Sequence, residues 1–114
     1  MNGEQLRLLS KMKKLINSGN RRFQVRKDRD YVQDLLEIGI SESQAWMIML
    51  ELNKNFYFND PKPSYYKSTD TLLFKKQING IITYIKLKLE KNKEKQEETV
   101  CLSFHKDKQI QRRK

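Results

Sequence analysis

Apolar and polar residues alternate along two stretches in the second half of the chain, residues 82–89 and 100–105. A period of two is typical of a strand with one face in the core and one face in solvent. In the first stretch one face carries Ile81, Thr83, Ile85, Leu87 and Leu89, and the other carries Ile82, Tyr84, Lys86 and Lys88. In the second stretch Val100, Leu102 and Phe104 share the apolar face, and Cys101, Ser103 and His105 share the opposite one. If both apolar faces lie on the core, Tyr84, Lys86 and His105 look out from one surface of a sheet.

A further strand is expected over residues 72–77, just before the first of these stretches. Asn79-Gly80 lies between the two, and this dipeptide is a strong signal for a two-residue hairpin turn. The polar and charged residues that precede the last strand predict a long hairpin loop. The pattern therefore predicts an antiparallel meander over residues 72–77, 81–90 and 99–105.

The first half of the chain has the apolar spacing of helices. In the opening segment apolar residues recur at helical intervals, at Leu6, Leu9, Met12 and Ile16. Gly19 is suited to end this helix, and residues 21–26 predict a short edge strand with Phe23 and Val25 turned inward.

Two more helices are predicted before the sheet. One is expected from Asp30 to Ile38, with Gly39 at its end. The next begins at Ser41, because Gln44 three residues later completes a capping box. Its apolar residues are expected to lie mostly in the core, namely Trp46, Met47, Met49, Leu50 and Leu52.

Helices followed by strands indicate an α+β fold, with the N-terminal helices packed on a small antiparallel sheet. Residues 1–105 are expected to form this single domain. Residues 106–114 have almost nothing to bury and predict a disordered basic tail. Residues 53–71 are loop-like, and we expect their aromatic side chains to pin the loop to the sheet more than to stack on bases, although both remain open: Phe56, Tyr57, Phe58, Tyr65 and Tyr66.

The charge of the chain points to a polyanionic partner. The net charge is +10 over 114 residues, which exceeds what solubility alone requires. No apolar run approaches the length of a membrane-spanning helix. The single cysteine, Cys101, cannot form an internal disulfide, and with one histidine it cannot build a zinc site, so a reducing cytoplasm is expected. No metal and no cofactor are predicted.

The second half of the chain also resembles a known family. The residues that carry the resemblance are Tyr57, Pro61, Leu73-Phe74, Asn79-Gly80, Tyr84-Ile85-Lys86, Val100 and Ser103-Phe104-His105. In this order they are similar to the MqsR-like toxins of bacterial type II toxin–antitoxin modules, which have a RelE-type fold. The resemblance implies a metal-free endoribonuclease that cuts mRNA and is held inactive by an antitoxin. Tyr84 matches the tyrosine of the family's YLK or YIK strand, and His105 stands where some members have lysine.

Metal-free cleavage of RNA requires a base, cationic donors and an acid, and the predicted sheet offers each. His105 is the natural acid for the departing 5′-oxygen, because imidazole titrates near neutral pH. Lys86 is a clamp for the scissile phosphate, and Tyr84 orients the 2′-hydroxyl or accepts its proton. Substrate-binding roles are expected for Lys75, Lys76, Lys88, Ser103, Arg21 and Arg22.

Two interpretations from other functional classes compete with that of a toxin-type endoribonuclease. In one, the protein is a non-catalytic nucleic-acid-binding regulator, or a phage or mobile-element accessory protein, that uses the same basic face and leaves His105 idle. In the other, the basic surface docks an acidic protein. A binder shows salt-sensitive affinity for RNA without cleavage products.

Overall fold

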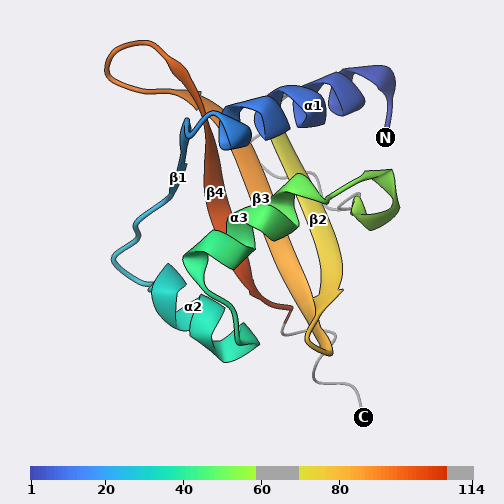
Figure 1. The fold of residues 1–114 in the computed structure, drawn as a ribbon, viewed down its shortest axis with the longest axis vertical. Coiled ribbons are helices and arrows are strands. Elements are labelled where there is room, and N and C mark those ends of the chain that lie inside the picture. Colours follow the sequence, from blue (N-terminus) through green and yellow to red (C-terminus); the bar gives the residue numbers. More distant parts are fainter. Residues whose placement is uncertain (59–69, 108–114) are drawn as a thin grey trace.

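Four strands form one mixed sheet, in the order β1-β4-β3-β2, within the part of the chain that the computed structural model describes, residues 1–58 and 70–107 (Figure 1). Along the chain the elements are α1 (Gly3–Asn17), β1 (Arg21–Phe23), α2 (Tyr31–Ile38), α3 (Glu42–Leu50), the 3-10 helix η1 (Lys54–Phe56), β2 (Thr71–Ile78), β3 (Ile81–Lys91) and β4 (Glu97–Lys106). β2, β3 and β4 are the predicted antiparallel meander. β1 pairs in parallel with β4, so the α+β class is confirmed but the sheet is mixed.

The described α-helices begin at side chains that cap them. Asn2 and Ser41 each accept a hydrogen bond from the backbone N–H of a glutamine three residues later, and that glutamine side chain accepts one from the cap residue's N–H. Asp30 caps α2. α2 ends at Gly39, whose φ of 86° lies in the left-handed region that favours glycine. The predicted starts of α2 and α3 and the predicted end of α2 are confirmed.

The turn between β2 and β3 is the predicted one. Asn79 and Gly80 have φ values of 51° and 78°, as a two-residue turn with two left-handed positions requires. The Asn79 side chain also donates from Nδ2 to the carbonyl of Ile38 at 3.0 Å. The hairpin turn therefore supplies a partner for the C-terminal end of α2.

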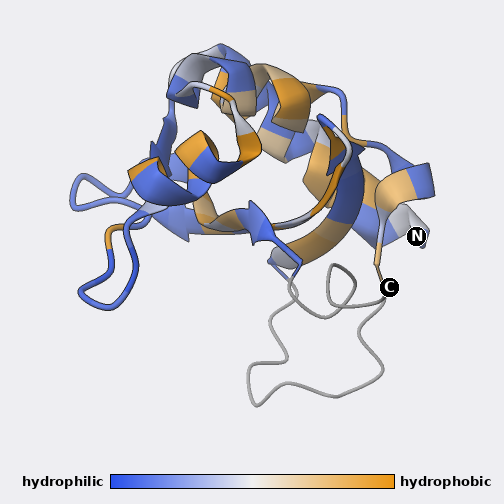
Figure 2. Cartoon of the chain, turned by 90° about the horizontal axis from the view of Figure 1, so that it is seen from below, coloured by the Kyte–Doolittle hydropathy of each residue, from blue (hydrophilic) through white to orange (hydrophobic). Residues whose placement is uncertain are grey.

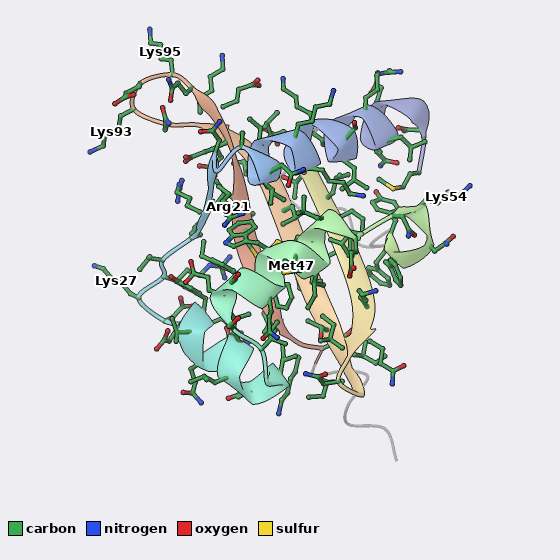
Figure 3. The ribbon with its side chains drawn as sticks, in the orientation of Figure 1. Arg21, Lys27, Met47, Lys54, Lys93 and Lys95 are labelled. Carbon is green, nitrogen blue, oxygen red and sulfur yellow. The ribbon has the colours of Figure 1, made fainter. Side chains whose placement is uncertain are left out.

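The second hairpin has longer strands and a shorter loop than the sequence predicts. β3 continues to Lys91 and β4 begins at Glu97, which leaves residues 92–96 as the loop. Asn92 Oδ1 accepts backbone hydrogen bonds from Glu94 at 2.9 Å and Gln96 at 3.0 Å. Figure 3 shows the labelled lysines of this tip, Lys93 and Lys95, pointing away from the sheet.

A β-bulge in β4 interrupts the alternation that the sequence predicts. Lys86 is opposite Ser103, but the next pair is Leu87 with Cys101, so Leu102 has no partner in the ladder. Cys101 therefore lies on the core face with Phe104, whereas Ser103 and His105 lie on the other face. The prediction that Cys101 shares the face of His105 is wrong, because an uninterrupted period of two was assumed.

α1, α2 and α3 lie on one side of the sheet and bury that face (Figures 1 and 2). The core contains side chains from each layer, among them Met12, Ile16, Leu35, Met49, Phe74, Ile85 and Leu87. Trp46, Met49 and Leu52 are buried as predicted. Met47 is 63% exposed, on the side of α3 away from the core (Figure 3), and Val25 is 81% exposed because β1 ends at Phe23. The inward placement predicted for these two is wrong.

The domain extends beyond the predicted boundary at residue 105. Lys106 is the last residue of β4, and the next residue, Asp107, is 6% exposed. The prediction that a tail with nothing to bury begins at Lys106 is therefore wrong. Residues 108–114 and the two tyrosines Tyr65 and Tyr66 lie outside the described residues. In the part that is described, no helix combines the length and the apolar character needed to cross a membrane.

Candidate functional site

One face of the sheet is not covered by any described helix, and we call it the open face (Figure 2). The two central strands contribute Tyr84 and Lys86 from β3 and Ser103 and His105 from β4. Tyr84 is opposite His105, and Lys86 is opposite Ser103. The bulge lies beyond these pairs, so it does not change their face. The prediction that Lys86 and His105 project from the same face is confirmed.

Tyr84 and His105 form an aromatic pair on the two central strands of this face, toward the β2–β3 turn. Their ring centroids are 5.2 Å apart and the ring planes differ by 11°, which is a stacked arrangement. Directly opposite residues in an antiparallel ladder are close enough for such stacking. The pair gives the open face a phenol and an imidazole side by side.

The tautomer of His105 follows from its local hydrogen bond. Nδ1 lies 2.8 Å from the backbone carbonyl of Lys106. A carbonyl oxygen only accepts, so Nδ1 carries the proton in this contact. Nε2 is then the nitrogen that gains and loses a proton as the ring titrates. The Nδ1 contact therefore fixes the orientation of the ring.

Lys86 is the cation next to this pair on the open face. Within residues 1–58 and 70–107, no carboxylate oxygen lies within 4.0 Å of its ammonium group. Leu73 flanks it on β2 and Ser103 on β4. Lys86 thus offers a full positive charge and a neighbouring hydroxyl on one row of the open face.

Lys75 is also on the open face, but it is held in an ion pair. It is opposite Tyr84 on β2, and its Nζ lies 2.7 Å from Oδ2 of Asp107. The same ammonium lies 3.9 Å from the centre of the Phe58 ring. The substrate-binding role predicted for Lys75 therefore requires competition with an internal carboxylate.

At the end of the open face away from the β2–β3 turn, charged side chains are also paired with one another. Glu90 and Glu98 are directly opposite each other, and Arg22 bridges them at 2.9 Å and 2.6 Å. Lys88 also lies 3.7 Å from Glu90. These contacts offset two like charges that are adjacent across the ladder. Arg22 and Lys88 are on the predicted face, but carboxylates contact both.

Arg21 and Lys76 are not brought to the open face. Arg21 pairs in register with Thr99 on the core side, where its guanidinium lies 5.3 Å from the Trp46 ring and donates to the Ile16 carbonyl at 3.1 Å (Figure 3). Lys76 is opposite Thr83, and its Nζ lies 4.0 Å from the Phe56 ring. Of the predicted substrate-binding residues, these two therefore lie on the helix side of the sheet.

Cys101 does not belong to the site. It is buried on the core face, and its Sγ lies 3.4 Å from the Ser103 carbonyl, to which the thiol can donate. Burial raises the pKa of the thiol far above its ordinary value, and this effect outweighs a lowering contribution from the backbone of Ser103. A neutral buried thiol is not a nucleophile for RNA.

One residue of the site, Asp107, and one contact, that of Phe58 with Lys75, were missed from the sequence. Asp107 stands two residues after His105, and a strand period of two puts it on the same face, so the sequence does contain a signal. Phe58 reaches Lys75 only because its backbone N–H bonds to the Leu73 carbonyl at 2.9 Å, which brings the loop to the edge of β2. The prediction that Phe58 pins this loop to the sheet is confirmed, but its contact with Lys75 was not predicted.

Comparisons with known proteins do not identify a function for this site. Among the described residues, no group of three His, Cys, Asp or Glu side chains is placed to hold a metal ion. Comparison of the chain with models of protein families finds no match, and a search of curated proteins finds none. The open face and the resemblance described above are therefore the basis on which a function is proposed.

Proposed function

We propose that the protein is a toxin-type endoribonuclease that cleaves mRNA in the cytoplasm, with the open face as its active site. The observation that carries the proposal is the stacked Tyr84–His105 pair with Lys86 on the same face. The RelE-type fold implied by the resemblance is part of the proposal. Its α+β class and central antiparallel meander agree with the sheet described here.

The proposed reaction is attack of the 2′-hydroxyl on the adjacent phosphorus. Tyr84, as the phenolate, accepts the 2′-hydroxyl proton, and the O2′–P bond forms while the P–O5′ bond breaks. His105 in its protonated form donates from Nε2 to the departing 5′-oxygen. The products are a 2′,3′-cyclic phosphate and a 5′-hydroxyl.

Lys86 is proposed to stabilise the charge that builds up on the phosphorane oxygens. A preorganised cation acts best where charge develops in the transition state. The absence of a competing carboxylate among the described residues supports Lys86 over Lys75 for this role. Ser103, opposite Lys86, is a second donor to the same phosphate.

Cleavage of a labelled single-stranded RNA in the presence of EDTA tests the proposal. We expect fragments that end in a 2′,3′-cyclic phosphate and begin with a 5′-hydroxyl. A matched RNA with 2′-deoxy sugars throughout should bind but remain intact. If chelation abolishes cutting, the metal-free mechanism is wrong.

Inhibition by an antitoxin protein is the second part of the proposal, and it comes from the family resemblance. The protein should arrest bacterial growth when expressed alone, and the product of an adjacent small gene should relieve the arrest. Growth that is unaffected by the protein would argue against a toxin.

A non-catalytic RNA-binding regulator is the second candidate. Stacked rings flanked by lysines also suit a platform on which bases of a single strand stack. The stacked Tyr84–His105 pair and the neutralised Lys75 favour this alternative over an acidic protein partner. If no RNA is cut with or without ribosomes while salt-sensitive binding persists, this candidate is the better account.

A further inference from the structure

The Lys75–Asp107 ion pair crosses the open face beside the Tyr84–His105 pair. Lys75 extends from β2, and Asp107 follows the end of β4, with β3 between them. The backbone N–H of Asp107 donates to the Ile82 carbonyl at 2.9 Å, which fixes the carboxylate at the hairpin end of the face. Its side chain is 7% exposed and that of Lys75 is 19% exposed, so both charges are shielded from water.

The charges on the two sides of the aromatic pair are therefore unequal. Along β3, Ile82 and Asp107 lie on one side of Tyr84, and Lys86 and Ser103 lie on the other. The two sides are separated by the four-residue step from Ile82 to Lys86, about 13 Å along a strand. His105 is equally near both sides in the ladder, but a phosphate held on the Asp107 side would lie across the ring from Lys86 and Ser103 and would lack both donors. Even a displacement of about 1 Å can cost about 100-fold in rate.

We propose that Asp107 is a positioning residue for the RNA substrate. By neutralising Lys75, it directs the scissile phosphate to Lys86 and Ser103, where His105 can protonate the leaving oxygen. This inference rests on the proposed function. It gives Lys75 a new role, because the pair with Asp107 excludes phosphate where Lys75 alone would attract it.

Phe58 makes the idea testable with a single change. The Phe58 ring is a second partner of the Lys75 ammonium, 3.9 Å from it, and comes from a different segment than Asp107. When Asp107 is replaced by asparagine, the ammonium should therefore remain in place with its charge no longer offset. It should then capture a phosphate of the RNA.

The experiment compares Asp107→Asn with the double variant Lys75→Met/Asp107→Asn. Binding is measured with a 2′-O-methyl RNA that cannot be cleaved, and kcat with the matching RNA at saturation. For Asp107→Asn we expect the logarithmic salt slope of binding to steepen by roughly 0.7, the value for one more phosphate contact on a single strand. We expect kcat to fall by about tenfold or more, because part of the bound RNA is misplaced. In the double variant the slope should return to that of the parent, and kcat should recover most of its loss.

Glu97→Gln is the matched control. It removes the carboxylate of another ion pair with a 2.7 Å contact, Lys11–Glu97, which joins α1 to the far end of β4. This variant should leave both the salt slope and kcat unchanged. The comparison separates the effect of losing the carboxylate at Asp107 from the effect of losing one negative charge anywhere on the protein.

The outcomes distinguish the inference from the proposed function. If the double variant is as slow as Asp107→Asn, with an unchanged salt slope in both, the pair is only structural and the inference fails. If the parent protein cuts no RNA, the proposed function fails. In that case an unchanged slope for Asp107→Asn still overturns the inference, and a steeper slope that Lys75→Met reverses still supports it for binding. Should Asp107→Asn not fold, the same comparison is made with Asp107→Ser.

Discussion

Lys86 is opposite Ser103, and this is the last regular pair before the bulge at Leu102. The extra residue shifts β4 by one position relative to β3, which reverses the faces on either side of it. As a result the imidazole of His105 stays on the open face and the thiol of Cys101 enters the core. The bulge thus removes the one cysteine from the surface that we propose to be catalytic.

Cys101 should react with a thiol reagent only when the protein unfolds. We expect no labelling by Ellman's reagent in buffer at pH 8 within the time that an unfolded control needs for completion. The reason is that burial both blocks access and keeps the thiol protonated. Stoichiometric labelling of the native protein at the rate of the unfolded control would show that Cys101 is on the surface after all.

The same burial makes stability depend on pH through Cys101. The pKa of its thiol is raised in the folded state, so above the ordinary value of 9.0 the unfolded chain loses this proton first. Stability that is fully present below pH 9 should therefore fall as pH rises, by up to about 1.4 kcal/mol per pH unit for this group. Urea denaturation of the parent and of Cys101→Ala between pH 8 and 11 measures it. The parent should show the steeper decline, and equal slopes would contradict the prediction.

Local signals in the sequence were enough for most of the elements. The caps at Asp30 and Ser41 and the Asn79-Gly80 turn depend on residues within a few positions, and each is found as predicted. The parallel pairing of β1 with β4 depends on residues about 78 positions apart, such as Arg21 with Thr99, and no local pattern encodes it. The bulge is hidden for the same reason, since it exists only relative to β3.

The candidate site was predicted in part. Its three proposed catalytic residues share a face because the period of two holds from Ser103 to His105 and along β3. The binding residues were chosen for charge alone, and charge does not tell which side chains already have partners. Arg21 packs on Trp46, and Lys75 contacts Asp107, because those long side chains find tertiary neighbours that are distant in sequence.

Asn79 should stabilise the C-terminal end of α2 as well as the turn in which it lies. Asn79→Asp keeps a residue that tolerates positive φ, but it removes the Nδ2 donor to the Ile38 carbonyl and adds a negative charge at the C-terminal end of α2. We expect a loss of about 1–2 kcal/mol in the free energy of unfolding. Gly80→Ala is a useful comparison, because it strains the turn at a φ of 78° without touching α2. Hydrogen exchange should reveal faster opening of α2 in Asn79→Asp only, and equal exchange in both variants would argue against the capping role.

Substitutions of Lys86 and Arg21 should separate an effect on RNA binding from an effect on stability. Lys86→Gln removes a cation of the open face, so the logarithmic salt slope for single-stranded RNA should fall by roughly 0.7. Arg21→Gln should leave that slope unchanged and cost about 1 kcal/mol in stability, through its lost contacts with Trp46 and the Ile16 carbonyl. Fluorescence anisotropy across a salt series and urea denaturation measure the two effects. A reversed result, with Arg21 controlling the slope, would place the RNA on the helix side of the sheet.

His105 should be the most sensitive position for cleavage. His105→Ala is expected to lower the rate by about 10²–10⁴-fold, the usual contribution of a positioned proton donor. The fold should persist, because His105 is only half-buried and lies outside the core cluster. His105→Lys should retain part of the activity, since an ammonium can also protonate the leaving oxygen, and Lys86→Ala should lower the rate without unfolding the sheet. The control is Ser43→Ala, an exposed change on α3 that should have no effect. Single-turnover cleavage of a labelled RNA measures all four variants beside the parent. If His105→Ala cuts RNA as fast as the parent, the stacked ring is structural and the non-catalytic binding protein becomes the better account.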